Sequence, residues 1–251
     1  MGRKKLVNLH EEIGRDFVQS IGKRPWWQWE AVESLYDGAI HQLDSSLNNL
    51  INELKDAGEF DNTLLIVTSD HGEGFGESDR IIPGLRIANH NYGIHEVLTH
   101  VPLVVKWPRQ NEQCLVSKFA AIKDFPSAVK TALRGKREDS AFIPEGPVFS
   151  STYRAKTIDT TPKSDNRKDY LGPWRAAYTL DDDRQIKFAD RNEESATIAI
   201  LDAQTSYQIK PTDNGRTEDL YERIEDKKMT EGLGHVDNSV EEKLSDLGYL
   251  R

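Results

Sequence analysis

Apolar residues recur at steps of three and four positions from Ala31 to Leu54, and this period predicts one long amphipathic helix. Lys55 and Gly58 follow it, and a cationic last turn with a glycine stop is typical of a helix end. At 1.5 Å per residue, such a helix is about 40 Å long. The positions that set the period are Ala31, Val32, Leu35, Tyr36, Ala39, Ile40, Leu43, Leu47, Leu50, Ile51 and Leu54.

Two short runs without a polar break have the pattern of buried strands. Residues 64–68, LLIVT, are apolar or β-branched, and they are followed directly by Ser69-Asp70-His71-Gly72. Residues 101–106, VPLVVK, form the second run. We expect both strands to be central, parallel and buried on both faces, with the long helix packed on one face of their sheet.

Further elements divide the chain into two parts. Residues 114–121 are a candidate third strand, and a short helix is expected from Asp124, which is placed to cap it, to about Gly135. Residues 136–146 are charged and rich in turn formers, so we place a boundary there, between residues 1–145 and 146–251.

The sequence pattern of residues 146–251 predicts a small antiparallel sheet with a helix. Asp181-Asp182-Asp183 marks a hairpin turn between two of its strands. The candidate strands are 147–153, 175–180, 185–189 and 196–201, and the candidate helix is 240–247.

Composition narrows the possible functions. The chain has 251 residues and a net charge of -9, which argues against nucleic acid and anionic membranes as partners because both attract basic patches. Its single cysteine, Cys114, excludes an internal disulfide and a cysteine-based zinc site. The N-terminus has no apolar signal-peptide core, and no apolar run is long enough to span a bilayer. We therefore expect the chain as given to be cytoplasmic.

Asp70 and His71 are the sharpest chemical signal. An acid and an imidazole sit together where a strand ends, the edge at which open α/β sheets bind ligands. A carboxylate oxygen and an imidazole nitrogen can reach one metal ion from such a loop. The alternative is a capping aspartate and a hydrogen-bonded histidine in a glycine turn. Glu73 and Glu77 place negative charge among the following glycines, which argues against a phosphate-binding loop.

Three histidines follow at intervals of five residues: His90, His95 and His100. Five is neither a helical nor a strand repeat, so we do not expect them to share one face. Each can bind an anion or act as an acid or base near neutral pH, and each can equally be an ordinary surface or hydrogen-bonded histidine.

Several segments carry a resemblance to a known family. The most specific are NTLLIVTSDHGEGFGE (62–77) and HNYGIHEVLTHVPLVVKWP (90–108), with further matches at Tyr36–Ile40, 123–135, 219–221 and 247–250. In these segments the chain resembles the second half of the sulfatases of the alkaline phosphatase superfamily. The resemblance implies part of an α/β fold with an alkaline-phosphatase-like sheet and flanking helices, followed by a small antiparallel sheet with a helix.

The resemblance also implies site residues. Asp70 matches the aspartate that binds a divalent cation, calcium or alternatively magnesium, and His71 matches the next metal ligand. His90 falls where the family places a residue that contacts the sulfate of the substrate. Asn91 and His95 depart from the family pattern around it.

The nucleophile motif of the family, C-x-P-x-R or S-x-P-x-R, does not occur in this sequence, so no catalytic residue can be named. We expect a truncated or split sulfatase that is inactive alone, with a sulfate ester as substrate and a separately encoded N-terminal half as partner. Two alternatives stay open. One is a phosphoethanolamine or phosphoryl transferase, or a phosphodiesterase, of the same superfamily, and the other is a non-catalytic remnant.

Overall fold

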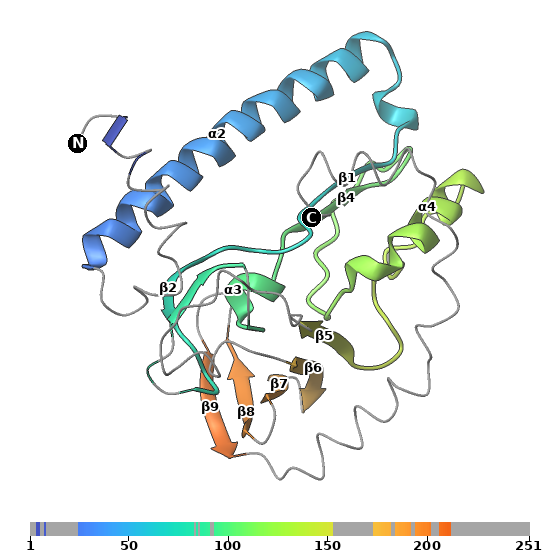
Figure 1. Cartoon of the computed structure of the whole chain (residues 1–251). Coiled ribbons are helices and arrows are strands. Elements are labelled where there is room, and N and C mark those ends of the chain that lie inside the picture. The colour runs from blue at the N-terminus through green and yellow to red at the C-terminus, as the bar shows by residue number, and fades with distance from the viewer. Residues whose placement is uncertain are drawn as a thin grey trace, which may run out of the picture. The chain divides into compact units, whose positions relative to one another are not determined.

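The computed structural model of the chain describes residues 25–82, 84, 86–90, 93–152, 173–181, 184–191, 194–201 and 206–211, together with residues 4, 5 and 8. By its internal contacts, the chain divides into two compact units, residues 1–212 and 213–251. All elements discussed below belong to the first unit (Figure 1). The boundary expected between residues 145 and 146 falls inside this unit and stays a prediction.

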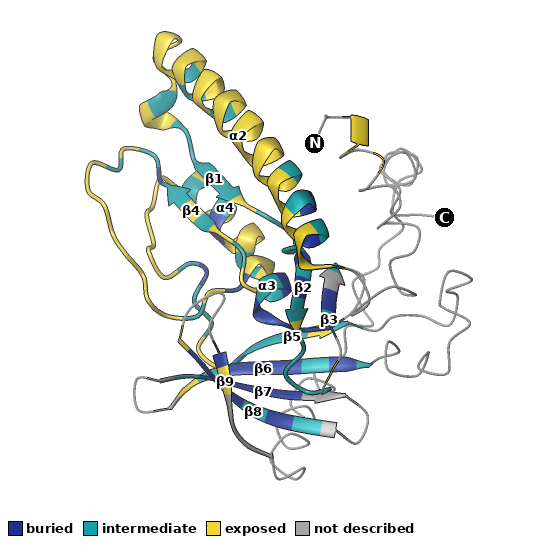
Figure 2. Ribbon diagram, turned by 90° about the vertical axis from the view of Figure 1, so that its left-hand side faces the viewer, coloured by how far each residue is buried: buried dark blue, intermediate teal, exposed yellow. Residues whose placement is uncertain are grey.

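The long helix is confirmed as α2, Trp26–Asp56, and it begins five residues earlier than its apolar period indicated. Gly58 follows with φ +72°, a left-handed conformation that glycine adopts without strain. The first turns of α2 bury Trp29 and Val32. Beyond them the helix is largely exposed (Figure 2), and its exposed apolar side chains include Ile40, Leu43 and Leu50.

The two predicted strands form, but the expected parallel pairing is wrong. β1 (Leu65–Thr68) and β4 (Leu103–Lys106) pair antiparallel in a two-stranded sheet, with Thr68 opposite Leu103. The cause lies in the connection, because a parallel pair needs a crossover that returns the chain to the start of the first strand. Here the connecting residues bring the chain back to the end of β1, where Gly72 N donates to Leu98 O at 2.9 Å.

Burial of this sheet is also lower than expected. The residues of β1 are half-buried apart from exposed Thr68, and Val104 of β4 is 61% exposed. The expectation of strands buried on both faces is therefore wrong for the described residues. The side chains of Leu64, Ile66, Leu103 and Val105 pack against a small cluster formed by Trp107, Ala128 and Phe142.

Three short elements lie between β1 and β4. β2 (Gly74–Ser78) and β3 (Arg86–Asn89) form an antiparallel hairpin with a bulge at Phe75 to Glu77, and α3 (Glu96–Thr99) is a single turn. After β4, residues 114–121 form no strand, which corrects that prediction. The short helix is confirmed as α4, Phe125–Leu133, preceded by the 3-10 turn Ile122–Asp124.

The small antiparallel sheet is confirmed and has five strands in chain order. Asp181 pairs with Arg184 in an antiparallel hairpin of two of them, as the aspartate run predicted. The predicted helix at 240–247 lies outside the described residues, as do the matching segments at 219–221 and 247–250. The strands are β5 (Val148–Thr152), β6 (Trp174–Asp181), β7 (Arg184–Arg191), β8 (Glu194–Ile200) and β9 (Ser206–Pro211).

One hydrophobic core joins the start of α2 and the β3–α3 region to this sheet. It includes Trp29, Ile87 and Leu98 on one side and Trp174 and Ile198 on the other. The described residues thus form a mixed α/β structure with a small antiparallel sheet, as predicted. None of the helices in the described ranges has the length and apolar character needed to cross a membrane, and the expected cytoplasmic location stays a prediction.

Candidate functional site

The turn after β1 brings the two predicted metal ligands together. Oδ2 of Asp70 lies 3.7 Å from Nε2 of His71, and the two side chains are 61% and 39% exposed. Oδ1 of Asp70 accepts a hydrogen bond from the His71 amide at 3.0 Å. The hydroxyl of Ser69 donates to the carbonyl oxygen of His71 at 2.6 Å. The local polar groups of the turn therefore hold its backbone and place one carboxylate oxygen close to the imidazole.

A second contact determines which ring nitrogen of His71 carries the proton. Its Nδ1 atom lies 2.9 Å from the carbonyl oxygen of Gly72. Since a carbonyl oxygen can only accept, Nδ1 carries the proton, and Nε2 of the neutral ring carries the lone pair. Histidines that bind metals usually donate their other ring N–H to a carbonyl or carboxylate in this way. His71 thus presents its coordinating nitrogen on the side of Asp70.

These atoms fit two positions of a cation site. Oδ2 is a hard oxygen donor and Nε2 is a neutral nitrogen donor, a combination that suits a divalent cation. Within the described part of the chain, no group of three or more His, Cys, Asp or Glu side chains could hold a metal ion. Since calcium takes about six to eight oxygen ligands, Asp70 and His71 can supply only part of its coordination. Their roles as metal ligands stay predictions.

His90, the predicted sulfate contact, lies beside His71. The two rings are stacked, with centroids 4.1 Å apart and planes at 26°. Nδ1 of His90 also lies 2.9 Å from Oε2 of Glu73. The preceding Asn89 has φ +62°, a conformation that asparagine tolerates, and its side chain accepts from the His90 amide at 2.6 Å. The structure therefore connects His90 to the Asp70 turn through the carboxylate of Glu73, a contact that the sequence did not predict.

The other two histidines have different positions. His95 is 3% exposed and caps α3, because its Nδ1 accepts the amide hydrogen of Val97 at 3.2 Å. Burial lowers the pKa of His95 to about 4, so this ring is neutral at neutral pH. His100 is exposed and follows α3 directly. Of the three histidines, His90 stacks on His71, and His100 lines the same cavity as Asp70 and His71.

A cavity of about 640 Å³ opens beside the turn, a size typical of small-molecule sites. Asp70, His71 and His90 all line it, and Lys118 and Lys123 add cationic side chains. Much of the remaining lining is apolar, including Val116, Phe119, Val148, Phe149, Tyr178 and Ile200. The cavity therefore combines groups that could hold an anion with a wall that could contact an apolar substituent.

Comparison with known proteins agrees with these features. The family model for Sulfatase matches residues 12–135, a segment that contains α2, the Asp70 turn, β4 and α4. This segment is thus similar to the sulfatase family. It contains all three site residues predicted from the sequence.

Two curated relatives match a shorter part of the chain. The inner membrane protein YejM of Salmonella typhimurium is 33% identical over 73 residues, which are 29% of this chain and 11% of YejM. The multifunctional alkaline phosphatase superfamily protein PehA of Trinickia caryophylli is 31% identical over 80 residues, which are 32% of this chain and 14% of PehA. The matches thus span only a small share of each relative. No solved structure matches the chain significantly.

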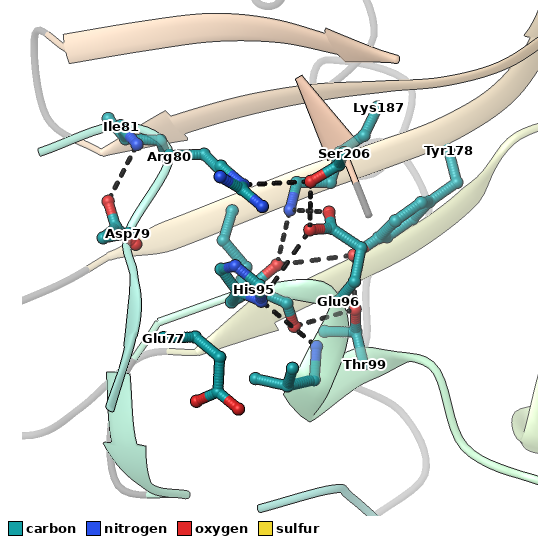
Figure 3. A network of polar contacts seen from close by, with 12 residues as sticks. Glu77, Asp79, Arg80, Ile81, His95, Glu96, Thr99, Tyr178, Lys187 and Ser206 are labelled. Carbon is teal, nitrogen blue, oxygen red and sulfur yellow. Dashed lines mark hydrogen bonds and ion pairs between the residues drawn. The ribbon is translucent and has the colours of Figure 1, made fainter. Parts of the chain in front are cut away.

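A buried polar network joins the sulfatase-family segment to the five-stranded sheet (Figure 3). Lys187 of β7 forms an ion pair with Glu96 of α3, and both side chains are 2% exposed. Lys187 also donates to the carbonyl oxygen of Ile94 at 2.8 Å, and Ser206 of β9 donates to Glu96 at 3.0 Å. No sequence signal pairs Glu96 with Lys187, because the two residues are 91 positions apart and belong to different elements.

The network determines the charge of both partners. Burial would raise the pKa of Glu96, yet the Lys187 ammonium and its hydrogen bond bring that pKa below its usual value. Burial lowers the pKa of Lys187, and the Glu96 carboxylate opposes this shift. The two charges therefore depend on each other, and neither can be removed alone without leaving its partner buried and unpaired.

Proposed function

We propose that this chain contributes the metal-binding end of a sulfatase-family hydrolase of sulfate esters. The observation that carries the proposal is the orientation of His71, whose Nε2 lone pair lies 3.7 Å from Oδ2 of Asp70. Similarity to the sulfatase family and the adjoining cavity support the same conclusion. A divalent cation held by these two residues, calcium or alternatively magnesium, would supply positive charge that stabilises the sulfuryl oxygens of the ester.

His90 is proposed to orient the sulfate group. As an imidazolium it would donate Nδ1–H to Glu73 and its second ring N–H to a sulfate oxygen. Its stacking on His71 and its place in the cavity lining support this role. The apolar lining would then contact the organic part of the ester.

The nucleophile is proposed to come from a polypeptide segment outside this sequence, because neither C-x-P-x-R nor S-x-P-x-R occurs in it. A sulfatase-family N-terminal half would supply this residue and further acidic metal ligands. The exposed apolar side chains of α2 support such a partner. Ile40, Leu43 and Leu50 are 50%, 66% and 46% exposed on one helix, and burial of these side chains by a partner would be favourable.

A second candidate is a phosphoryl transferase or phosphodiesterase of the same superfamily. The observation that favours it is the similarity to PehA, a protein named as a multifunctional member of the alkaline phosphatase superfamily. The Asp70–His71 pair and the cavity would serve a phosphate ester equally well, since both ester classes place anionic oxygens next to a cation.

The experiment measures hydrolysis of an aryl sulfate and of a bis-aryl phosphate with calcium or magnesium present. We expect no turnover by the isolated chain, because removing a nucleophile typically costs several orders of magnitude in rate. Co-expression with an N-terminal half that carries C-x-P-x-R should produce sulfate-ester hydrolysis. Asp70→Ala should abolish it, and Asp139→Ala should leave it unchanged because Asp139 pairs with Arg137 on the surface.

Two outcomes would contradict the proposal. Turnover by the isolated chain that Asp70→Ala removes would show that this chain contains its own nucleophile. Hydrolysis of the phosphate diester in place of the sulfate by the reconstituted protein would favour the second candidate.

A further inference from the structure

Three strands of the five-stranded sheet hold the single turn of α3. Lys187 of β7 pairs with Glu96, and Ser206 of β9 donates to the other oxygen of Glu96 at 3.0 Å. The hydroxyl of Tyr178 on β6 lies 2.5 Å from that of Thr99. Figure 3 shows these side chains converging on α3. The position of α3 is therefore set by residues that lie outside the segment matching the sulfatase family.

α3 in turn holds the candidate metal-binding turn. The amide of Gly72 donates to the carbonyl oxygen of Leu98 at 2.9 Å. A Cβ atom at Gly72 would lie 1.9 Å from the carbonyl oxygen of Val97, so the two backbones approach each other more closely than any other residue type allows. A small displacement of α3 must therefore move the peptide of Gly72.

Gly72 transmits this position to the imidazole of His71. Its amide bonds to α3, while its carbonyl oxygen accepts Nδ1–H of His71 at 2.9 Å. One residue thus connects α3 to the group that selects the tautomer of His71. The path from Lys187 to His71 consists of the Lys187–Glu96 ion pair, one turn of helix and two hydrogen bonds of Gly72.

From this path we infer that Lys187 and Glu96 are positioning residues for the Asp70–His71 turn, acting through α3 and Gly72. Neither residue has to touch a metal or a substrate for this role. The inference rests on the proposed function only for what the turn binds. The mechanical connection itself can be measured in the chain without any ligand.

The test uses the double variant Glu96→Gln, Lys187→Met. It removes both charges together, so that no unpaired buried charge remains to unfold the protein. Amide hydrogen exchange at Gly72 should accelerate at least tenfold relative to wild type, while the amides of β7 and β8 keep their protection. Nitrogen NMR of the His71 ring at pH 8.5 should show the Nδ1–H tautomer in wild type and a mixture of tautomers in the variant.

Two further variants make the test specific. Lys106→Met is the matched control, because Lys106 also donates to backbone carbonyl oxygens, those of Phe60 and Thr63. Lys106 belongs to β4 and lies opposite Leu65, at the end of β1 that is distant from Gly72. It should leave Gly72 and His71 unchanged. Ser206→Ala removes one hydrogen bond to Glu96 and is the milder alternative if the double variant unfolds. It should produce a smaller change in the same direction.

The outcomes separate the two proposals. If the folded double variant or Ser206→Ala shows wild-type exchange at Gly72 and the wild-type tautomer at His71, the positioning role is wrong. Titration of the wild-type chain with Mn²⁺ tests the metal site independently. Failure of manganese to bind would contradict the proposed function and would leave the exchange result to decide the positioning role.

Discussion

Nε2 of His71 lies 3.7 Å from Oδ2 of Asp70 because the carbonyl oxygen of Gly72 accepts a hydrogen bond from Nδ1 on the other side of the imidazole ring. The pair follows a short strand, as the sequence indicated, but its geometry depends on a residue with no side chain. Gly72 connects this pair to α3 through the carbonyl oxygen of Leu98. Gly72 therefore determines how the imidazole of His71 is held relative to α3.

Gly72→Ala should destabilise the folded protein by about 3 kcal/mol, because the added Cβ would overlap the carbonyl oxygen of Val97 and force backbone movement. Gly38→Ala is the control. Gly38 lies inside α2 with no atom within 4 Å of its added Cβ, so this substitution should stabilise the protein by about 1 kcal/mol. Urea unfolding measures both. Equal stability of the two variants would show that α3 does not confine Gly72.

The buried ion pair predicts strong coupling between Lys187 and Glu96. Lys187→Met alone should cost about 3–5 kcal/mol of unfolding free energy, because it leaves the Glu96 carboxylate buried without its partner. Glu96→Gln in the same chain should restore much of this loss. A double-mutant cycle by urea unfolding checks the coupling. Additive losses from the two substitutions would mean that the charges do not depend on each other.

Because His95 is buried, we expect the folded protein to lose stability in mild acid. Its pKa is lowered from 6.5 to about 4 by burial, so the folded protein binds fewer protons at this site than the unfolded chain does between these values. The contribution of His95 is complete above pH 6.5 and falls as the pH is lowered toward 4. Between pH 7.5 and pH 5 the unfolding free energy should fall by about 2 kcal/mol from this group.

The control for this pH dependence is His95→Asn, which keeps a side-chain acceptor for the Val97 amide and removes the titrating ring. Burial raises the pKa of Glu77 and of Asp79, and these groups act in the opposite direction in both proteins. The difference between wild type and variant therefore isolates His95. Identical pH profiles for the two proteins would contradict the burial of this ring.

Local sequence patterns predicted the elements well where a period or a turn former determined them. The apolar repeat of α2 and the aspartate run that predicted the β6–β7 hairpin are examples. The direction of β4 relative to β1 was not predictable in this way, because it depends on the path of the residues between them. That path is set by β2, β3 and the bond between Gly72 and Leu98.

In the candidate site, too, local sequence predicted the ligands but not the long-range contacts that orient them. Asp70 and His71 could be proposed from adjacent letters at a strand end, and the structure places their side chains close together. The contacts that orient them involve residues distant in sequence, such as Glu73 with His90 and Glu96 with Lys187. Neither pair has a spacing that a strand or helix period would reveal, so only the folded chain shows them.

Binding of a divalent cation at Asp70 and His71 is tested most directly by Mn²⁺ titration followed by NMR of the histidine side chains. Manganese below one equivalent should broaden the ring signals of His71 first, and calcium should reverse the broadening. Asp70→Ala should weaken this effect at least about tenfold in manganese concentration, while Asp139→Ala leaves it unchanged. His71 signals that stay sharp, or broadening that Asp70→Ala does not alter, would contradict a metal site at the end of β1.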